Sequence, residues 1–537
     1  MFLPAFNIKL MQMIVGSCLH SNIFPEYRRR NAVRLLMIVG GLLLKLSLGA
    51  QNVGLGTTTP ISRLHIEQGN VLFNGPAVLP PVPAPLLVSG TGARLMWYPD
   101  KAAFRVGYVS FNSWDSSLIG TYSFAAGKDV TAQGSGSVAL GLSSNAAGQV
   151  SIAIGSNCIA FDSSIALGKS AQSFGTKAVA IGNAARSGSS NSFAIGNSAT
   201  VPSAGTYGFA IGNNVTASGP YSLAMGNNSS ASGPYSVAIG TNPTASGQDA
   251  VAFGRNSQAI GNFSTSFGLS SIASGLYSTA FGVGTLASEP YTTAFGRDNT
   301  ASGFAATAFG NNSIASGGNS LAIGYAVSAT GSNSVSLGSY VSTSGYAGAF
   351  ALGDFSTTTV MNSFVDNGFR ARFAGGYRLF TNSAASIGAF LNANANSWAA
   401  LSDVRMKENF LPVNGENFLQ KIAAMPQYTW NYIGQDAGTL RHYGPMAQDF
   451  FKAFGRDDLG EIGCDTLINQ QDFLGVSFIA IQALEKRSAE QAKENDLLKN
   501  KLLLLEEANK DLAGKLVLLN ENMDATLKLV KELIANK

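Results

Sequence analysis

The stretch SLAMGNNSSASGPYSVAIG, residues 222–240, decides the fold. It contains the pattern S-x-A-x-G twice, at residues 222–226 and 236–240, with turn-forming residues between the two copies. Within each copy, small and apolar side chains alternate with a period of two, which is typical of a β-strand. The stretch therefore predicts short strands closed by tight turns.

The glycine of this pattern recurs along much of the chain. Thirteen of the sixteen intervals between successive copies are 14 residues long. The recurring glycines are Gly127, Gly141, Gly155, Gly168, Gly182, Gly196, Gly212, Gly226, Gly240, Gly254, Gly268, Gly282, Gly296, Gly310, Gly324, Gly338 and Gly353. A fixed internal period of this kind indicates a repeat architecture, in which each repeat stacks on its neighbours.

The repeat length predicts a narrow roll. A strand advances about 3.3 Å per residue, so one repeat supplies two strands of about five residues and two turns, and successive coils stack about 4.8 Å apart. Small residues such as Ser222 and Ala224 suit the lumen, whereas Leu223 and Met225 point outward. We expect the same face of other copies of the chain to cover these outward apolar side chains.

The S-x-A-x-G units at residues 120–353 resemble the head of YadA-type trimeric autotransporter adhesins. The resemblance implies a mainly β fold, a trimeric parallel β-roll, and a place outside the cell. It does not fix a ligand, so extracellular matrix, a glycan or another cell surface all stay open as partners of such a head.

Composition excludes several function classes. The 537 residues are 12% charged with a net charge of +4, and Lys and Arg form no stripe, so no nucleic-acid partner is expected. Three cysteines and five scattered acids at residues 120–353 favour neither a metal cluster nor a calcium-binding roll, and we expect no cofactor. An ice-binding solenoid is a minor alternative, because the threonines hold no single column.

The N-terminal region, residues 1–50, resembles an export signal. Four arginines between Arg28 and Arg34 precede an apolar run at residues 35–48, and Ala50 offers a cleavage site before Gln51. We expect export to the cell surface or the medium, with a start codon assigned too early as one explanation for residues 1–27. A membrane anchor is the alternative, although the run is shorter than the roughly 20 residues that span a bilayer.

Two further β regions flank the repeats. Residues 51–119 predict a small β module, in which Trp97, Tyr98 and Trp114 are core residues rather than a binding patch, and His65 is structural rather than a metal ligand. Residues 354–401 predict a β neck, with a hairpin formed by the alternating segment 369–380.

A candidate reactive pair follows the neck. Ser402 and Lys407 lie five residues apart in the segment LSDVRMKEN, residues 401–409. A lysine that is desolvated at a subunit interface can lose its proton and serve as the general base for a serine nucleophile. On spacing alone, a solvated loop is the ordinary interpretation.

Residues 402–409 resemble the opening of the endosialidase-type intramolecular chaperones of phage tail spikes, and segments 442–449 and 478–485 extend the resemblance. It implies an α+β chaperone domain at residues 402–475 that cuts its own chain after trimerisation. By this resemblance Leu401–Ser402 is the scissile bond, Ser402 the nucleophile and Lys407 its base. Asp403 and Asn409 are expected to orient the turn, while His442 either assists or, as we favour, packs structurally.

Residues 476–537 predict an α-helical coiled coil, because eleven of sixteen heptad a and d positions are apolar. These positions are Ile481, Leu484, Ser488, Gln491, Asn495, Leu498, Leu502, Leu505, Asn509, Leu512, Leu516, Leu519, Met523, Thr526, Val530 and Leu533. A single amphipathic helix packed on the chaperone is the alternative. Asn495 and Asn509 at a positions fit a dimer as readily as a trimer.

Together these regions predict an exported homotrimeric fibre or adhesin whose chaperone drives assembly and is released by autoproteolysis. The enzyme activity would be at most a single-turnover cut by a Ser–Lys dyad, and not cleavage of other proteins. The alternative is a structural surface appendage without a receptor, in which the C-terminal domain only trimerises.

Overall fold

The structure is a computed structural model that describes residues 52–86 and 88–536. The predicted export signal and the alternative anchor lie outside these residues. The chain forms two compact units, one running through Tyr377 and including Leu391–Trp398, the other comprising Arg378–Phe390 and the chain from Ala399 onward. In the part of the chain that the structure describes, no helix has the length and apolarity required to cross a membrane.

The first unit begins with the expected β module. Strands β1 (Val53–Leu55) and β2 (Leu64–Ile66) pair in parallel, and β3 (Gly92–Tyr98) runs antiparallel to β4 (Ala103–Val109). Tyr98 and Trp114 are buried, and the Trp114 indole N–H donates to the carbonyl oxygen of Val130 at 2.9 Å. Both aromatic residues therefore belong to the core, while Trp97 is half-buried.

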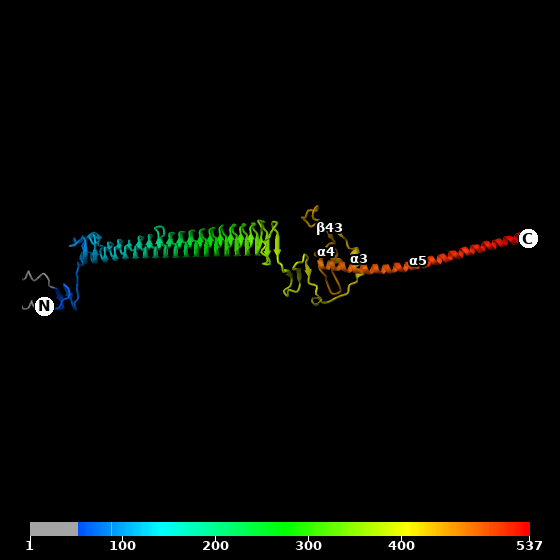
Figure 1. Cartoon of the computed structure of the whole chain (residues 1–537), viewed down its shortest axis with the longest axis horizontal. Helices are drawn as coiled ribbons and strands as arrows, with labels where there is room; N and C mark the ends of the chain where they lie inside the picture. Colours follow the sequence, from blue (N-terminus) through cyan, green and yellow to red (C-terminus); the bar gives the residue numbers. More distant parts are fainter. Residues whose placement is uncertain (1–51, 87, 537) are drawn as a thin grey trace, which may run out of the picture. The chain divides into compact units, whose positions relative to one another are not determined.

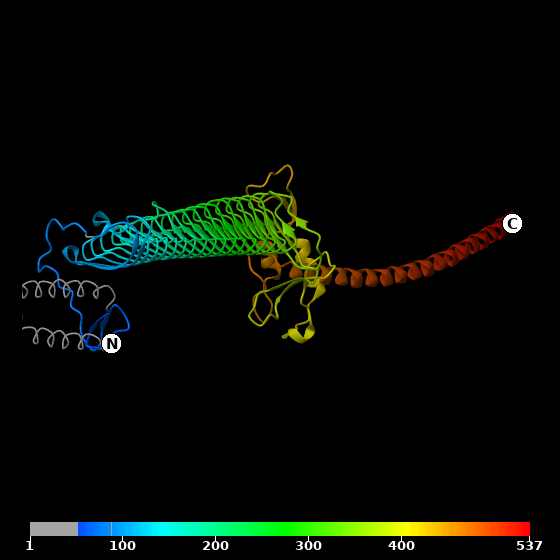
Figure 2. The same ribbon diagram turned by 60° about the vertical axis from the view of Figure 1, so that its left-hand side comes forward.

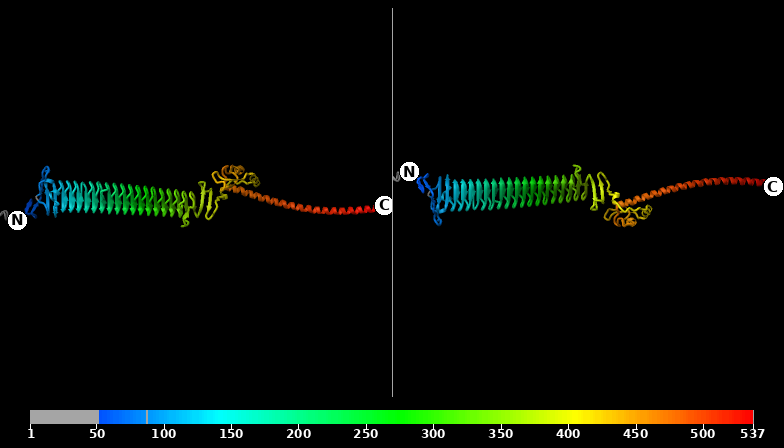
Figure 3. Two further views of the ribbon diagram at one scale, coloured as in Figure 1. Left: turned by 90° about the horizontal axis from the view of Figure 1, so that it is seen from above. Right: turned by 90° about the horizontal axis from the view of Figure 1, so that it is seen from below.

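A stack of parallel coils forms the body of this unit, and β4 begins its first coil by pairing in parallel with β5 (Figures 1 and 2). The long strands of successive coils form one sheet: β5 Phe124–Lys128, β7 Val138–Leu142, β9 Ile152–Ser156, β11 Ile165–Lys169, β13 Val179–Asn183, β15 Phe193–Asn197, β17 Phe209–Asn213, β19 Leu223–Asn227, β21 Val237–Thr241, β23 Val251–Arg255, β25 Thr265–Leu269, β27 Thr279–Val283, β29 Thr293–Arg297, β31 Thr307–Asn311, β33 Leu321–Tyr325, β35 Val335–Ser339, β37 Phe350–Gly353 and β39 Phe369–Arg372. Figure 3 shows these strands side by side along the stack.

A second parallel sheet contains the short strand of each coil: β6 Thr131–Ala132, β8 Asn145–Ala146, β10 Ile159–Ala160, β12 Gln172–Ser173, β14 Arg186–Ser187, β16 Thr200–Val201, β18 Thr216–Ala217, β20 Ser230–Ala231, β22 Thr244–Ala245, β24 Gln258–Ala259, β26 Ile272–Ala273, β28 Leu286–Ala287, β30 Thr300–Ala301, β32 Ile314–Ala315, β34 Ser328–Ala329, β36 Val341–Ser342 and β38 Met361–Asn362. These strands have two residues and not the predicted five. Each coil also contains two corners with left-handed backbone, seven residues apart, as at Tyr221 and Asn228, and these corners shorten the second side.

The parallel roll and its lumen are confirmed. Ser222, Ala224, Ser236 and Ala238 are at most 1% exposed, and successive alanines align in register, as Ala224 does with Ala238. Outward side chains on the same strands are partly exposed. Only small side chains fit inside a coil of this size, so alanine and serine side chains fill the lumen.

The recurring glycines hold the coils at their spacing. Along the column from Gly107 to Gly338, a Cβ on each glycine would come within 3.0 Å of the carbonyl oxygen of the glycine in the next coil. Each of these glycines also has a φ between +96° and +142°, which side chains rarely adopt. Any other residue in this column would push two coils apart.

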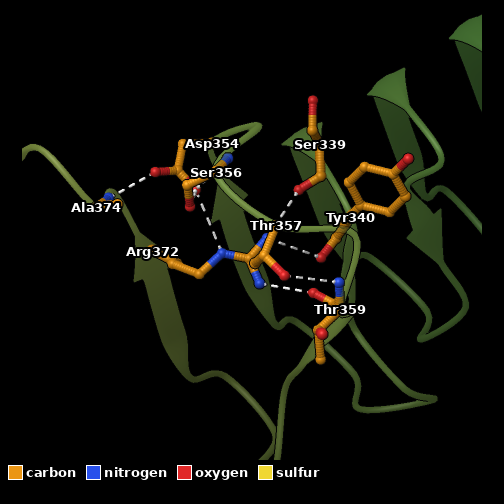
Figure 4. Close-up of polar contacts among 8 residues, drawn as sticks. All are labelled: Ser339, Tyr340, Asp354, Ser356, Thr357, Thr359, Arg372 and Ala374. Carbon is orange, nitrogen blue, oxygen red and sulfur yellow. Dashed lines mark hydrogen bonds and ion pairs between the residues drawn. The ribbon is translucent and has the colours of Figure 1, made fainter.

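A polar cluster closes the C-terminal end of the roll (Figure 4). The Asp354 carboxylate accepts hydrogen bonds from the Ala374 amide at 2.6 Å and the Ser356 hydroxyl at 2.7 Å, and it pairs with Arg372 at 3.3 Å. Arg372 also donates to three backbone carbonyl oxygens, those of Thr359, Ser339 and Tyr340. The cluster thus ties the last strands of the roll to one another through side-chain and backbone hydrogen bonds.

The predicted hairpin at residues 369–380 is wrong. Strand β39 pairs in parallel with β37 and is a coil of the roll, whereas β40 (Gly376–Phe380) joins β41 (Gly388–Asn392) and β42 (Ala399–Ala400) in a separate sheet. The Phe369 ring lies 5.7 Å from the Phe350 ring in the preceding coil. This column contact continues the roll past its last regular repeat.

The second unit has the expected α+β composition. Helix α3 (Gly415–Ala424) contacts α5 (Gln470–Ala535), α4 is Ala447–Phe454, and β43 (Tyr428–Trp430) pairs antiparallel with β44 (His442–Gly444). Its small core contains Phe450, Phe454 and Ala480. A short 3-10 helix, η3 (Val404–Met406), precedes α3; in the first unit, two others are η1 (Pro99–Lys101) and η2 (Ser116–Leu118).

We expect Gly240→Ala to lower the free energy of unfolding by about 2–4 kcal/mol, because its Cβ would collide with the backbone of Gly254 and its backbone is left-handed. The matched control is Gly514→Ala in α5, where a Cβ meets no atom within 4 Å. That change should be neutral or stabilise the helix by up to about 1 kcal/mol. Thermal unfolding followed by circular dichroism distinguishes the two, and equal effects would contradict the glycine column.

We expect the C-terminal cap to loosen in acid. The hydrogen bond from the Ala374 amide, followed by that from Ser356, lowers the pKa of Asp354. A carboxyl whose pKa is lower in the folded state stabilises the fold above its unfolded pKa of about 3.9, and this stabilisation is lost as the pH falls through the folded pKa. The amide protection factor of Ala374 should fall between pH 5 and pH 2. Asp354→Asn should remove this pH dependence, and a factor that is constant with pH in the parent would refute the assignment.

Candidate functional site: a serine–lysine pair at the start of the second unit

A single helical turn brings Ser402 and Lys407 together. Strand β42 ends at Ala400, and η3 spans Val404–Met406, so that Lys407 follows the turn in extended conformation. The Lys407 ammonium group donates a hydrogen bond to the Ser402 Oγ at 2.7 Å. The pairing expected from the five-residue spacing is therefore present within one chain.

Asp403 and Arg405 fix this turn. The Asp403 carboxylate accepts from the backbone amide of Arg405 at 2.9 Å and thereby caps η3, and it also pairs with the Arg405 guanidinium at 2.6 Å. The hydrogen bond from the Arg405 side chain, followed by the one from its amide, lowers the pKa of Asp403. An ionised Asp403 therefore holds the backbone and the side chain of Arg405 in this turn.

Arg405 is a residue of this turn that was not predicted from the sequence. The spacing could have indicated it, because the carboxylate of an acid that caps a helical turn can bind both the backbone amide and the side chain of a basic residue two positions later. Arg405 acts on the serine–lysine pair only through Asp403, since its guanidinium is largely exposed and pairs with that carboxylate.

Water reaches the pair in the single chain. Ser402 and Lys407 are both exposed, and Leu401 is 39% exposed. A lysine amine works as a general base when its surroundings are desolvated, and one chain does not supply that desolvation. The arrangement thus contains the reactive groups without the enclosure that their chemistry requires.

The other two predicted site residues, His442 and Asn409, make different contacts. The His442 ring lies 4.6 Å from the Trp430 ring, and its Nε2 is 3.3 Å from the Gln435 Oε1. Asn409 has a left-handed backbone with φ of 60°. Between residues 52 and 536, apart from residue 87, no hydrogen bond links either residue to Ser402 or Lys407. His442 is positioned by packing on an aromatic neighbour.

Across the same described residues, no three His, Cys, Asp or Glu side chains gather in a way that could hold a metal ion. The Nδ1 of His65 accepts a hydrogen bond from the Ile61 amide at 3.4 Å.

Comparison with known proteins identifies two families in the chain. Residues 402–458 match the family described as the chaperone of endosialidase, so the match begins at Ser402 itself. Six segments match the YadA head domain repeat: residues 132–157, 162–185, 217–242, 245–271, 273–299 and 301–326. No curated protein matches the chain. The chain therefore joins a YadA-like head to an endosialidase-type chaperone domain.

Proposed function

We propose that the chain is exported and assembles as a homotrimeric adhesive fibre, and that its chaperone domain is then released by cleavage of the Leu401–Ser402 bond. The observation that carries this proposal is the hydrogen bond of 2.7 Å between Lys407 and Ser402, at the first residue of the chaperone match. Cell-surface location is supported by the resemblance of the head to adhesins.

The chemistry follows from the two side chains. In its neutral form, the Lys407 amine takes the proton of the Ser402 hydroxyl, and the Oγ attacks the Leu401 carbonyl carbon. The Leu401–Ser402 C–N bond breaks, the proton passes to the departing Ser402 nitrogen, and an ester joins Leu401 to the Ser402 Oγ. Water hydrolyses this ester and leaves a carboxylate at Leu401 and a new N-terminus at Ser402.

Assembly would supply the desolvation that a single chain lacks. The leucines of α5 are exposed, with Leu502 at 59% and Leu505 at 60%. Packing three such helices along their a and d positions would bury these side chains and gather three chains. The high effective concentration that results would favour pairing of three heads and bring other surfaces close to Lys407.

The head also presents an apolar face that other copies could cover. Phe253, Phe267, Phe281, Phe295 and Phe309 form one outward column, each 38–45% exposed, with neighbouring rings 4.7–4.9 Å apart. A continuous apolar stripe of this length is typical of an interface. A structural appendage without a receptor would share these features, and a binding assay on matrix proteins, glycans and cells separates it from an adhesin.

We expect the full chain to yield two fragments that meet between Leu401 and Ser402, whereas Ser402→Ala and Lys407→Met remain whole. Each substitution removes one partner of the proton transfer, so cleavage should slow by at least about 100-fold. Denaturing gels and intact mass spectrometry measure the outcome.

Ser397→Ala is the matched control, since this nearby serine is exposed and, among the residues that the structure describes, makes no hydrogen bond to the pair; it should cleave like the parent. A parent chain that is folded and trimeric but never cut would reduce Ser402 and Lys407 to structural residues.

We expect Leu502→Asp to raise the concentration needed for assembly by at least tenfold, about 1.4 kcal/mol, because it places a charge in the helical seam. Leu503→Asp is the matched control. The exposed fraction of Leu503 in the single chain, 62%, is close to that of Leu502, but Leu503 lies outside the seam. Light scattering against concentration gives the mass of each variant. Equal behaviour of the two variants would support a lone helix instead of a coiled coil.

A further inference from the structure

One corner of the roll carries a column of aromatic side chains. At the left-handed corner that precedes each long strand, seven coils place a ring, and all seven are 40–65% exposed. These residues are Tyr122, Tyr207, Tyr221, Tyr235, Phe263, Tyr277 and Tyr291. Hydrogen bonds between successive coils, such as Tyr235 N–H to the Pro220 carbonyl at 2.8 Å, keep the corners stacked.

Aromatic residues at these corners strain the backbone. Their φ values lie between 56° and 61°, in a region that disfavours bulky side chains and that Asn, Asp and Gly tolerate best. Other coils use Asn191, Asn319 and Asn333 in the same column. Since the rings remain half-exposed, burial within the chain does not offset the cost, and backbone strain of this kind is often retained for a function.

Six of these rings form two stacks with a gap between them. Tyr207, Tyr221 and Tyr235 stack with centroids 4.9 and 5.1 Å apart, and Phe263, Tyr277 and Tyr291 stack at 4.8 and 5.5 Å. The coil between the two stacks carries Asp249 at its corner. The last ring of the first stack and the first ring of the second therefore lack a stacking neighbour on the side facing Asp249.

The gap has the dimensions of a cation site. Coils repeat about every 4.8 Å, so the Tyr235 and Phe263 rings lie about 10 Å apart along the axis, and a group midway between them lies about 5 Å from each. A cation within about 6 Å of a ring centroid is attracted by its face. The slot therefore offers a cation one ring on each side.

The Asp249 carboxylate is available to such a cation. Its backbone amide donates to the Pro234 carbonyl at 2.9 Å, but among the residues that the structure describes no hydrogen bond or ion pair engages its side chain. Two other acids of the roll do have side-chain partners: Asp129 accepts from Ser110, and Asp298 pairs with Arg297. A single carboxylate is too few oxygen ligands for a calcium ion, and its charge repels anions.

We propose that Tyr235, Asp249 and Phe263 form a binding slot for a guanidinium group, presented by an arginine of a partner protein. A planar guanidinium can stack between the two rings and donate two hydrogen bonds to one carboxylate, which a compact ammonium cannot do. One chain alone forms this slot, so it stands independently of trimer assembly and of cleavage at Ser402.

The probe is the peptide acetyl-Gly-Arg-Gly-amide, added to the full chain and followed by NMR or calorimetry. We expect a dissociation constant of about 1 mM, and binding at least tenfold weaker for the matched lysine and citrulline peptides. Asp249→Asn should weaken arginine binding about tenfold. Asp249→Tyr should abolish binding and keep the fold, because the new ring would fill the gap, as rings do in neighbouring coils.

Asp298→Asn is the control, since this acid occupies the opposite corner with no flanking ring stack, and it should bind as the parent does. Circular dichroism of each variant verifies the fold. The proposal is overturned if the parent does not bind the arginine peptide, if the lysine peptide binds equally well, or if a folded Asp249→Asn variant binds as tightly as the parent.

Discussion

The contact between glycines of successive coils governs the first unit. Each glycine of the column, such as Gly240, has a left-handed backbone and leaves no room for a Cβ beneath the next coil. This contact sets the spacing of the coils and therefore aligns every other position of the repeat: alanine in the lumen, apolar side chains outside, and left-handed residues at two corners. A roll stabilised by nearest-neighbour contacts depends on the regularity of this one column.

Because side chains fill the lumen, only positions on the outside of the roll can bind other molecules. Because Ala224 and its equivalents occupy the interior, only outward strand positions and corners are free to vary without disturbing the stack. One outward column changes from Ile239 to Phe253, and one corner column changes from Asn191 to Tyr207 and then to Asp249. The constant positions thus specify the fold, while the variable ones distinguish one coil from the next.

Much of this could be predicted from the sequence, because period and residue size are local properties. The lumen positions followed from alternation, whereas the Ser402–Lys407 pair was identified by its resemblance to the chaperone family, because spacing alone favours a solvated loop. The hairpin at 369–380 failed because β39 is held by a ring contact with Phe350, which alternation does not reveal. The Asp249 slot was equally hidden, since it arises from the register of three coils and from no motif.

The two units differ in how many of their polar and apolar groups find partners within a single chain. Backbone groups of the roll are paired coil by coil and closed at its end by Asp354 and Arg372, so its fold needs no partner for hydrogen bonding. The second unit places Ser402 and Lys407 at hydrogen-bond distance yet leaves both in water, and it exposes the leucines of α5. A general base that depends on desolvation would stay inactive until another surface covers it. The same geometry would therefore order the proposed events, with assembly first and cleavage second, because an isolated chain lacks the enclosure that cleavage requires.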